Sequence, residues 1–241
     1  MVATQTKNPE GLVLIPGLNC TPALYAAQWP ALASGRQILV ADNTTDDTIA
    51  AMVDRLLAVA PERFALCGLS MGGYVAFEVI RRAPERVTRL ALLDTSAKPP
   101  TPETNAPREQ MIALAQKGAF DNVVTVLWQK LVAPDRLADE ALRLEVRAMA
   151  EMVGPAGFIR QQQAIMGRSD ARPALGTITV PTLVVVGAED AITPPDDARE
   201  IAAGVGPRAR YLEIPGCGHL STLEAPEIVT AALLEWLGRS G

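Results

Sequence analysis

The sequence predicts an α/β protein: a doubly wound parallel sheet of about six strands with a helical lid. Short apolar runs alternate along the chain with longer helical patterns, as they do in parallel sheets that are covered on both faces. One long block between two of these runs is helical throughout and contains no strand pattern. The composition, 49% hydrophobic and 20% charged, is that of a soluble globular chain and excludes a disordered one.

The strands are expected where apolar and β-branched residues cluster in short runs, at 12–15, 37–41, 64–67, 90–93, 182–186 and 209–214. The sheet helices are expected between and after these runs, at about 48–59, 71–83, 195–203 and 226–237. The first begins behind Asp46 and Asp47, and Pro84 stops the second. The last two open with a proline, which suits a first helical turn.

The all-helical block lies between the fourth and fifth strands. Its entry, residues 98–107, reads KPPTPETNAP, and these prolines predict neither helix nor strand. Four helical patterns follow, separated by glycine and proline, at 108–117, 119–132, 139–153 and 156–167. We expect a core formed by 1–96 and 177–241 and an inserted cap formed by 97–176, over the sheet edge where ligands bind in open α/β folds. Arg168 and Asp170 are expected to form an ion pair where the chain leaves the cap.

Charge, hydropathy and cysteine spacing limit the partners and the compartment. A net charge of −5 disfavours nucleic acid and anionic membranes, because both bind basic patches. No apolar run approaches the ~20 residues of a membrane span, and the polar residues 1–10 contain no signal peptide. The cysteines match no zinc spacing and predict a reducing, cytoplasmic setting. With His219 as the single histidine we expect no metal and no cofactor, and a monomer and a dimer both stay open.

The motif that carries chemistry follows the third strand. Residues 64–67 run into Gly68-Leu69-Ser70-Met71-Gly72, a G-x-S-x-G pattern between a strand and a helix. The small residues are needed there because the strand and helix backbones nearly touch. The serine hydroxyl is thereby held above the sheet edge, which predicts Ser70 as a catalytic nucleophile.

A general base and an acid are expected at the ends of two later strands. His219 lies in a glycine-containing loop after the last strand, and its near-neutral pKa suits proton transfer to and from a hydroxyl. Asp190 follows the fifth strand directly and would orient the imidazole. Asp94, at the end of the fourth strand, is an alternative, although a role in capping the loop into the lid is favoured; Glu189 is expected to point away.

Backbone amides and lid side chains complete the predicted site. The Leu18 amide, in the loop after the first strand, and the Met71 amide, at a helix start, would bind a developing oxyanion, with Asn19 as the alternative to Leu18. For the acyl pocket, Trp128, Met152 and Phe158 are the predicted lining residues. The wider set of large apolar lid residues that could contribute is Trp128, Met111, Met149, Met152, Phe158 and Met166.

Three blocks together resemble the α/β-hydrolase superfamily: GLSMGG at 68–73, PTLVVVGAED at 181–190 and GCGHLSTLEAP at 216–226. Within it, GLSMGG together with His219-Leu220-Ser221 is similar to the 3-oxoadipate enol-lactonase group and its small-ester esterase relatives. The resemblance implies an acyl-enzyme route in which Ser70 attacks a carbonyl and His219 transfers the proton. The chain departs from the family at Pro16 and Leu69, where histidine is common, and has too few residues before the first strand for the usual N-terminal hairpin.

The function predicted first is a serine hydrolase that cleaves a small carboxylic ester or lactone. Two alternatives stay open. The same three residues could serve C–C bond hydrolysis, perhydrolysis or elimination, or the fold could be a small-molecule binding or signalling protein.

Overall fold

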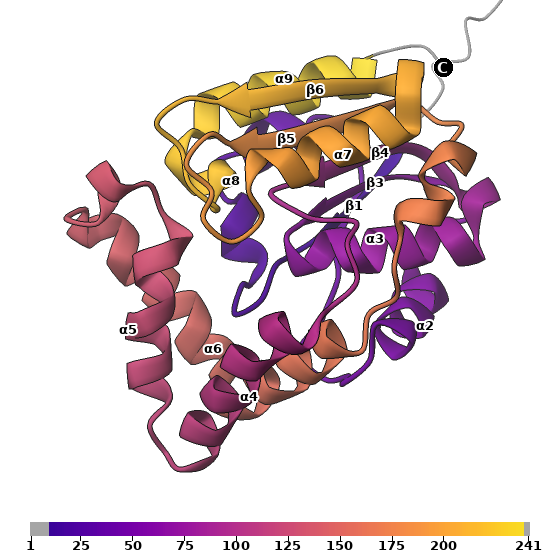
Figure 1. The fold of residues 1–241 in the computed structure, drawn as a ribbon. Coiled ribbons are helices and arrows are strands. Elements are labelled where there is room, and N and C mark those ends of the chain that lie inside the picture. The colour runs from indigo at the N-terminus through magenta and orange to yellow at the C-terminus, as the bar shows by residue number, and fades with distance from the viewer. Residues whose placement is uncertain (1–9, 239–241) are drawn as a thin grey trace, which may run out of the picture.

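In a computed structural model, which describes residues 10–238, six strands form a single sheet (Figure 1). The strands are β1 (Gly11–Ile15), β2 (Ile38–Val40), β3 (Phe64–Leu69), β4 (Val87–Leu93), β5 (Thr182–Gly187) and β6 (Ala209–Ile214). Their order is β2-β1-β3-β4-β5-β6, and every pairing in the described range is parallel. The predicted fold class and all six strand positions are therefore confirmed.

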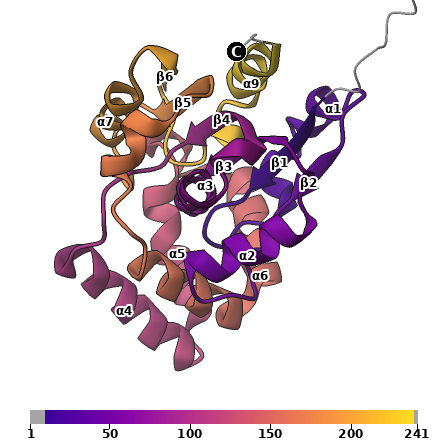
Figure 2. The ribbon, with the colours of Figure 1, turned by 90° about the vertical axis from the view of Figure 1, so that its right-hand side faces the viewer.

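Helices cover both faces of the sheet. They are α1 (Trp29–Leu32), α2 (Ile49–Val59), α3 (Met71–Arg82), α7 (Pro195–Val205), α8 (Ser221–Glu224) and α9 (Pro226–Gly238). Alternate side chains of β1 point to opposite faces, so Val13 belongs to the core cluster that includes residues of α2, α3 and α7, whereas Leu14 belongs to the cluster that includes residues of α1 and α9. Figure 2 shows α2 and α3 on one side of the strands and α1 and α9 on the other.

Parallel register brings the carboxyl ends of the strands to one edge. Ile15 of β1 is paired with Gly68 of β3, and Leu69 of β3 with Leu93 of β4. At the other side of the sheet Gly187 of β5 is paired with Ile214 of β6. The loops that follow these strands therefore start next to one another, at the edge where open α/β folds bind ligands.

Three helices lie between β4 and β5 in the chain: α4 (Pro102–Gln116), α5 (Phe120–Leu131) and α6 (Glu140–Met166). Figure 1 shows them grouped together, apart from α7 and α9. Within α6 the backbone of Gly154 is not helical (φ 68°, ψ 170°), so the element is two helices joined at the predicted break. No helix among residues 10–238 is long and apolar enough to cross a membrane.

The expectation that residues 98–107 contain no helix is wrong for 102–107. α4 begins at Pro102, because Thr101 and Thr104 cap each other: the Thr104 amide donates to Thr101 Oγ1 (3.3 Å) and the Thr101 amide to Thr104 Oγ1 (2.8 Å). Pro102 occupies the first turn, where no amide hydrogen is required. Pro107 lies inside the helix, so the cap and the following turns offset the backbone bond that it lacks.

Candidate active site

Ser70 lies on a sharp turn between β3 and α3. Its φ is 55°, a left-handed conformation that is strained for any residue with a side chain. The turn is possible because its flanks are glycines: a Cβ on Gly68 would lie 2.3 Å from the carbonyl oxygen of Gly72, and a Cβ on Gly72 would lie 2.0 Å from that of Ile15. The fold thus holds the Ser70 hydroxyl above the edge of the sheet.

The structure brings the three side chains predicted as a triad into one hydrogen-bonded chain. His219 Nε2 lies 2.8 Å from Ser70 Oγ, and His219 Nδ1 lies 2.8 Å from Asp190 Oδ2. The His219 and Asp190 side chains are buried. Asp190 follows β5 and His219 follows β6, so residues far apart in sequence meet through the parallel register.

Neighbouring donors fix the Asp190 carboxylate. Its Oδ1 accepts the amide hydrogens of Ile192 (2.8 Å) and Thr193 (2.9 Å), and its Oδ2 accepts the Thr193 hydroxyl (2.8 Å). Burial raises the pKa of Asp190, but His219 and these amides outweigh it and hold the pKa below its ordinary value. Burial lowers the pKa of His219, and the adjacent Asp190 more than offsets this, so the net shift is upward.

Asp94 lies next to this chain but does not contact His219. Its Oδ1 accepts the Gly187 amide (3.1 Å), and its Oδ2 accepts the amide (3.2 Å) and the hydroxyl of Ser221. Full burial, together with the nearby charge of Asp190, raises the pKa of Asp94 to about 8. Asp94 therefore joins the end of β5 to the segment after His219, and does not cap the loop into the lid as predicted.

Glu224 is a functional candidate that the sequence reasoning missed. The buried carboxylate accepts the amides of Gly218 (3.1 Å) and Leu220 (3.2 Å), which flank His219 on both sides. It also accepts the Ala133 amide (2.8 Å), which follows α5. In the sequence, Glu224 stands out only as an acidic residue among apolar neighbours just before Pro226. A charge in such a position is ordinarily interpreted as surface-exposed.

The loop after β1 passes directly against Ser70. A Cβ on Gly17 would lie 3.4 Å from Ser70 Cβ, and the Leu18 amide donates to no protein group among residues 10–238. The Asn19 amide, by contrast, donates to Gln161 Oε1 (2.9 Å) and is not free to bind an oxyanion. Met71 is the first residue of α3, so its amide has no partner within the helix.

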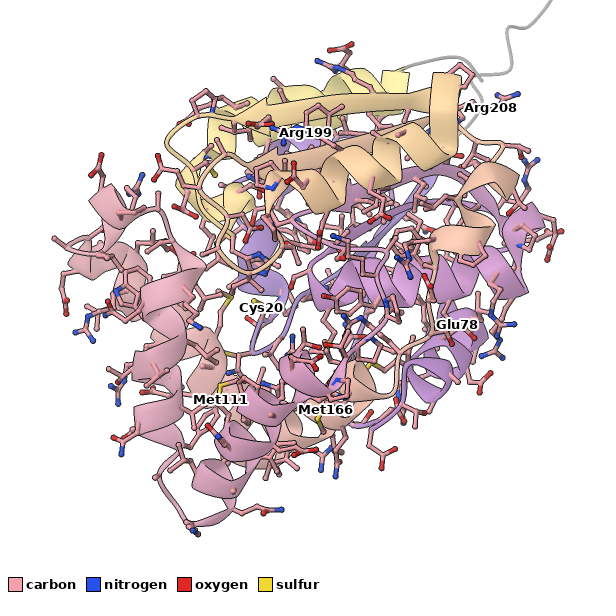
Figure 3. All side chains as sticks on the ribbon, in the orientation of Figure 1. Cys20, Glu78, Met111, Met166, Arg199 and Arg208 are labelled. Atoms are coloured by element: carbon pink, nitrogen blue, oxygen red, sulfur yellow. The ribbon has the colours of Figure 1, made fainter. Side chains whose placement is uncertain are left out.

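A cavity of about 250 Å³ opens beside Ser70 and His219. Cys20 from the core and Met111 from α4, both labelled in Figure 3, are among its lining residues. Leu127 and Leu131, one helical turn apart on α5, also line it. The walls are thus largely apolar and come from both the sheet edge and the inserted helices.

The predicted lining residues Trp128, Met152 and Phe158 do not line this cavity, which is a correction. Trp128 is one position further round α5 than Leu127, so it points into the core and donates to the Leu137 carbonyl. Met152 is 76% exposed. Phe158 is fully buried and packs against Phe120, with ring centroids 5.4 Å apart.

Comparison with known proteins agrees with the fold. Residues 12–232 match the model of the alpha/beta hydrolase family. Pimeloyl-[acyl-carrier protein] methyl ester esterase of Aromatoleum aromaticum is 29% identical over 241 residues, covering 91% of this chain and 95% of its own. A thermophilic esterase from Thermogutta terrifontis superposes with a TM-score of 0.85 at 28% identity, over 95% of this chain and 90% of that one. The enol-lactonase from Burkholderia xenovorans LB400 gives a TM-score of 0.84 at 25% identity, over 98% and 94%.

Proposed function

Because the chain belongs to the alpha/beta hydrolase family, we propose that it is a serine hydrolase that cleaves a small carboxylic ester or lactone through an acyl-enzyme on Ser70. The observation that carries the proposal is the chain of 2.8 Å contacts from Ser70 through His219 to Asp190. The named activities of the relatives, two esterases and an enol-lactonase, support this substrate class.

In the proposed reaction Ser70 Oγ attacks the carbonyl carbon while its proton passes to His219 Nε2. Asp190 accepts the Nδ1 hydrogen and stabilises the imidazolium that forms. The amides of Leu18 and Met71 donate to the oxyanion, a contribution of about 3 kcal/mol for one such donor in comparable sites. His219 then protonates the leaving alcohol oxygen, and water, deprotonated by His219, releases the acid and restores Ser70.

We also propose that the segment 97–176, which contains α4–α6, acts as a cap over this reaction. Met111, Leu127 and Leu131 support it, because they close the cavity beside Ser70. The Leu131 carbonyl accepts the His219 amide (3.0 Å), so the same helix that lines the cavity also fixes the histidine loop. Enclosure of this kind would exclude bulk water while the acyl-enzyme forms.

The direct test is hydrolysis of p-nitrophenyl acetate and p-nitrophenyl butyrate by the wild type and by Ser70→Ala. We expect turnover by the wild type and none above the solvent rate with Ser70→Ala. Wild-type protein that is folded and releases no p-nitrophenolate from either ester would contradict the proposed function, and so would turnover that survives in Ser70→Ala.

A further inference from the structure

A second hollow, lined in part by basic side chains, adjoins the cavity beside Ser70. The two share Tyr74, Thr104, Arg108 and Ile192. The second hollow, about 270 Å³, is also lined by Arg168, Lys98 and Arg172. Arg108 therefore lines both the apolar cavity at the nucleophile and a hollow that contains three further basic side chains and the carboxylate of Asp197.

Arg108 has no carboxylate partner among residues 10–238. Its Nη1 donates to the neutral Gln162 Oε1 (2.7 Å), and its enclosed Nε has no hydrogen-bond partner. The other basic groups of the hollow are neutralised: Lys98 pairs with Asp197, and Arg172 pairs with Asp170 (2.7 Å). Burying a guanidinium whose N–H donor has no partner costs free energy, unless an anion accepts a hydrogen bond from that donor.

Arg168 adds a second uncompensated charge. The predicted ion pair between Arg168 and Asp170 does not form, because Asp170 pairs with Arg172 instead. The Arg168 guanidinium stacks on the Tyr74 ring, 4.4 Å from its centroid, and donates to the carbonyls of Ile165 (2.9 Å) and Lys98 (3.2 Å). Burial lowers the pKa of Arg108, and the charge of Arg168 lowers it further.

We propose that the substrate is an acidic ester or lactone, whose carboxylate binds Arg108 while its reacting carbonyl lies at Ser70. A guanidinium presents its donors in a planar fork that matches a carboxylate, and Arg168 strengthens the local positive field. Arg108 is then the residue that determines specificity for a charged substrate. This inference rests on the proposed hydrolase function and adds the chemical class of the substrate.

The test compares matched esters. Mono-p-nitrophenyl succinate, glutarate and adipate carry a terminal carboxylate where p-nitrophenyl butyrate, valerate and hexanoate carry a methyl group. The ratio of kcat/KM, charged over neutral, is measured for each pair after subtraction of the rate with Ser70→Ala. We expect a ratio above unity for at least one chain length, and a fall of about tenfold to hundredfold in Arg108→Gln. Arg108→Lys keeps the charge but lacks the planar pair of donors, so its charged-over-neutral ratio should lie between those of the wild type and Arg108→Gln.

The matched control is Arg199→Gln. This variant also removes one positive charge, but from an exposed side chain on α7, labelled in Figure 3, that does not line either hollow. Its ratio should equal that of the wild type. A wild-type ratio below unity at every chain length, or an equal fall in Arg199→Gln, would overturn the inference.

Ligand binding separates this inference from the proposed function. Calorimetric titration of Ser70→Ala with monomethyl glutarate, which carries one carboxylate, and with the uncharged methyl valerate requires no turnover. We expect monomethyl glutarate to bind at least about tenfold more tightly, and this preference to be lost in Ser70→Ala/Arg108→Gln. Equal affinities in the Ser70→Ala background would refute the anion site even if neutral esters are hydrolysed, whereas the preference for monomethyl glutarate without ester turnover would refute only the hydrolase proposal.

Discussion

Asp190, rather than Asp94, contacts the imidazole of His219, although both carboxylates are buried at neighbouring strand ends. Asp190 meets a ring nitrogen, whereas Asp94 meets only backbone amides and the Ser221 hydroxyl. We therefore expect Asp190→Asn to lower kcat/KM by about 10⁴-fold, because an amide stabilises neither the tautomer nor the imidazolium. Asp94→Asn should cost about tenfold or less, because Asp94 accepts hydrogen bonds from Gly187 and Ser221 and does not contact the imidazole. A larger loss of kcat/KM in Asp94→Asn than in Asp190→Asn would show that Asp94, and not Asp190, orients His219.

In the proposed mechanism, the protonation of His219 is expected to set the acidic limb of the pH profile. Only the neutral imidazole can accept the Ser70 proton, so kcat/KM should rise as pH increases through the pKa of His219. Asp190 holds that pKa above its ordinary value of 6.5, and the midpoint is therefore expected above pH 6.5. In Asp190→Asn the residual activity should show a midpoint at lower pH, because the charge that raises the pKa is gone. A wild-type midpoint below 6.5, measured from kcat/KM across the pH range, would contradict this electrostatic account.

At the scale of elements, the short loop that carries His219 is fixed by Glu224 of α8. In the native protein the backbone amides share the two carboxylate oxygens of Glu224, whereas the side chain of Glu224→Gln offers them a single oxygen. We therefore expect kcat to fall about tenfold with little change in KM. Unfolding free energy should fall by about 2 kcal/mol, as for the loss of a hydrogen bond to a charged group. The control is Glu227→Gln, an exposed residue in the first turn of α9, which should change neither quantity. A fall in stability alone, with kcat unchanged, would show that Glu224 supports the fold but does not position His219.

α5 contributes Leu127 and Leu131 to the wall of the cavity, and we expect this wall to limit the length of the acyl group. Leu127→Ala enlarges the cavity, so the ratio of kcat/KM for p-nitrophenyl hexanoate over acetate should rise. The rise should correspond to a gain in binding free energy of about 0.8 kcal/mol for each methylene newly accommodated. Val126→Ala, on the same helix but 56% exposed, is the matched control and should leave the ratio unchanged. If both variants behave alike, the cavity is not the acyl pocket.

Prediction from sequence succeeded where a local pattern determines the geometry. Gly68, Ser70 and Gly72 specify a turn that only small flanking residues allow, and the strand ends placed Asp190 and His219 at the same sheet edge. It failed for the lid side chains, because the rotation of a helix about its axis depends on tertiary packing: Leu127 faces the cavity, and the adjacent Trp128 faces the core. The start of α4 was missed because the prolines outweighed the reciprocal cap of Thr101 and Thr104.

For the whole molecule, a single parallel sheet serves as the frame on which residues from four strand ends meet. The segments after β1, β3, β5 and β6 contribute Leu18, Ser70, Asp190 and His219, and residues of the inserted helices line the cavity beside them. The site therefore depends on the register of β1 and β3–β6, and its residues are spread over positions 18–219. Ser70 was predicted from its local pattern, whereas its meeting with His219, 149 positions later, follows from the order of the strands.

Ser70 is proposed to be a nucleophile that His219 activates. The most direct measurement is labelling with diethyl p-nitrophenyl phosphate, which transfers its phosphoryl group to an activated serine and leaves it stably modified. We predict release of one equivalent of p-nitrophenolate per chain, loss of ester hydrolysis in parallel, and a mass increase on the peptide that contains Ser70, with no labelling of Ser70→Ala. Modification of another residue, or ester hydrolysis that persists in the fully labelled protein, would contradict the account.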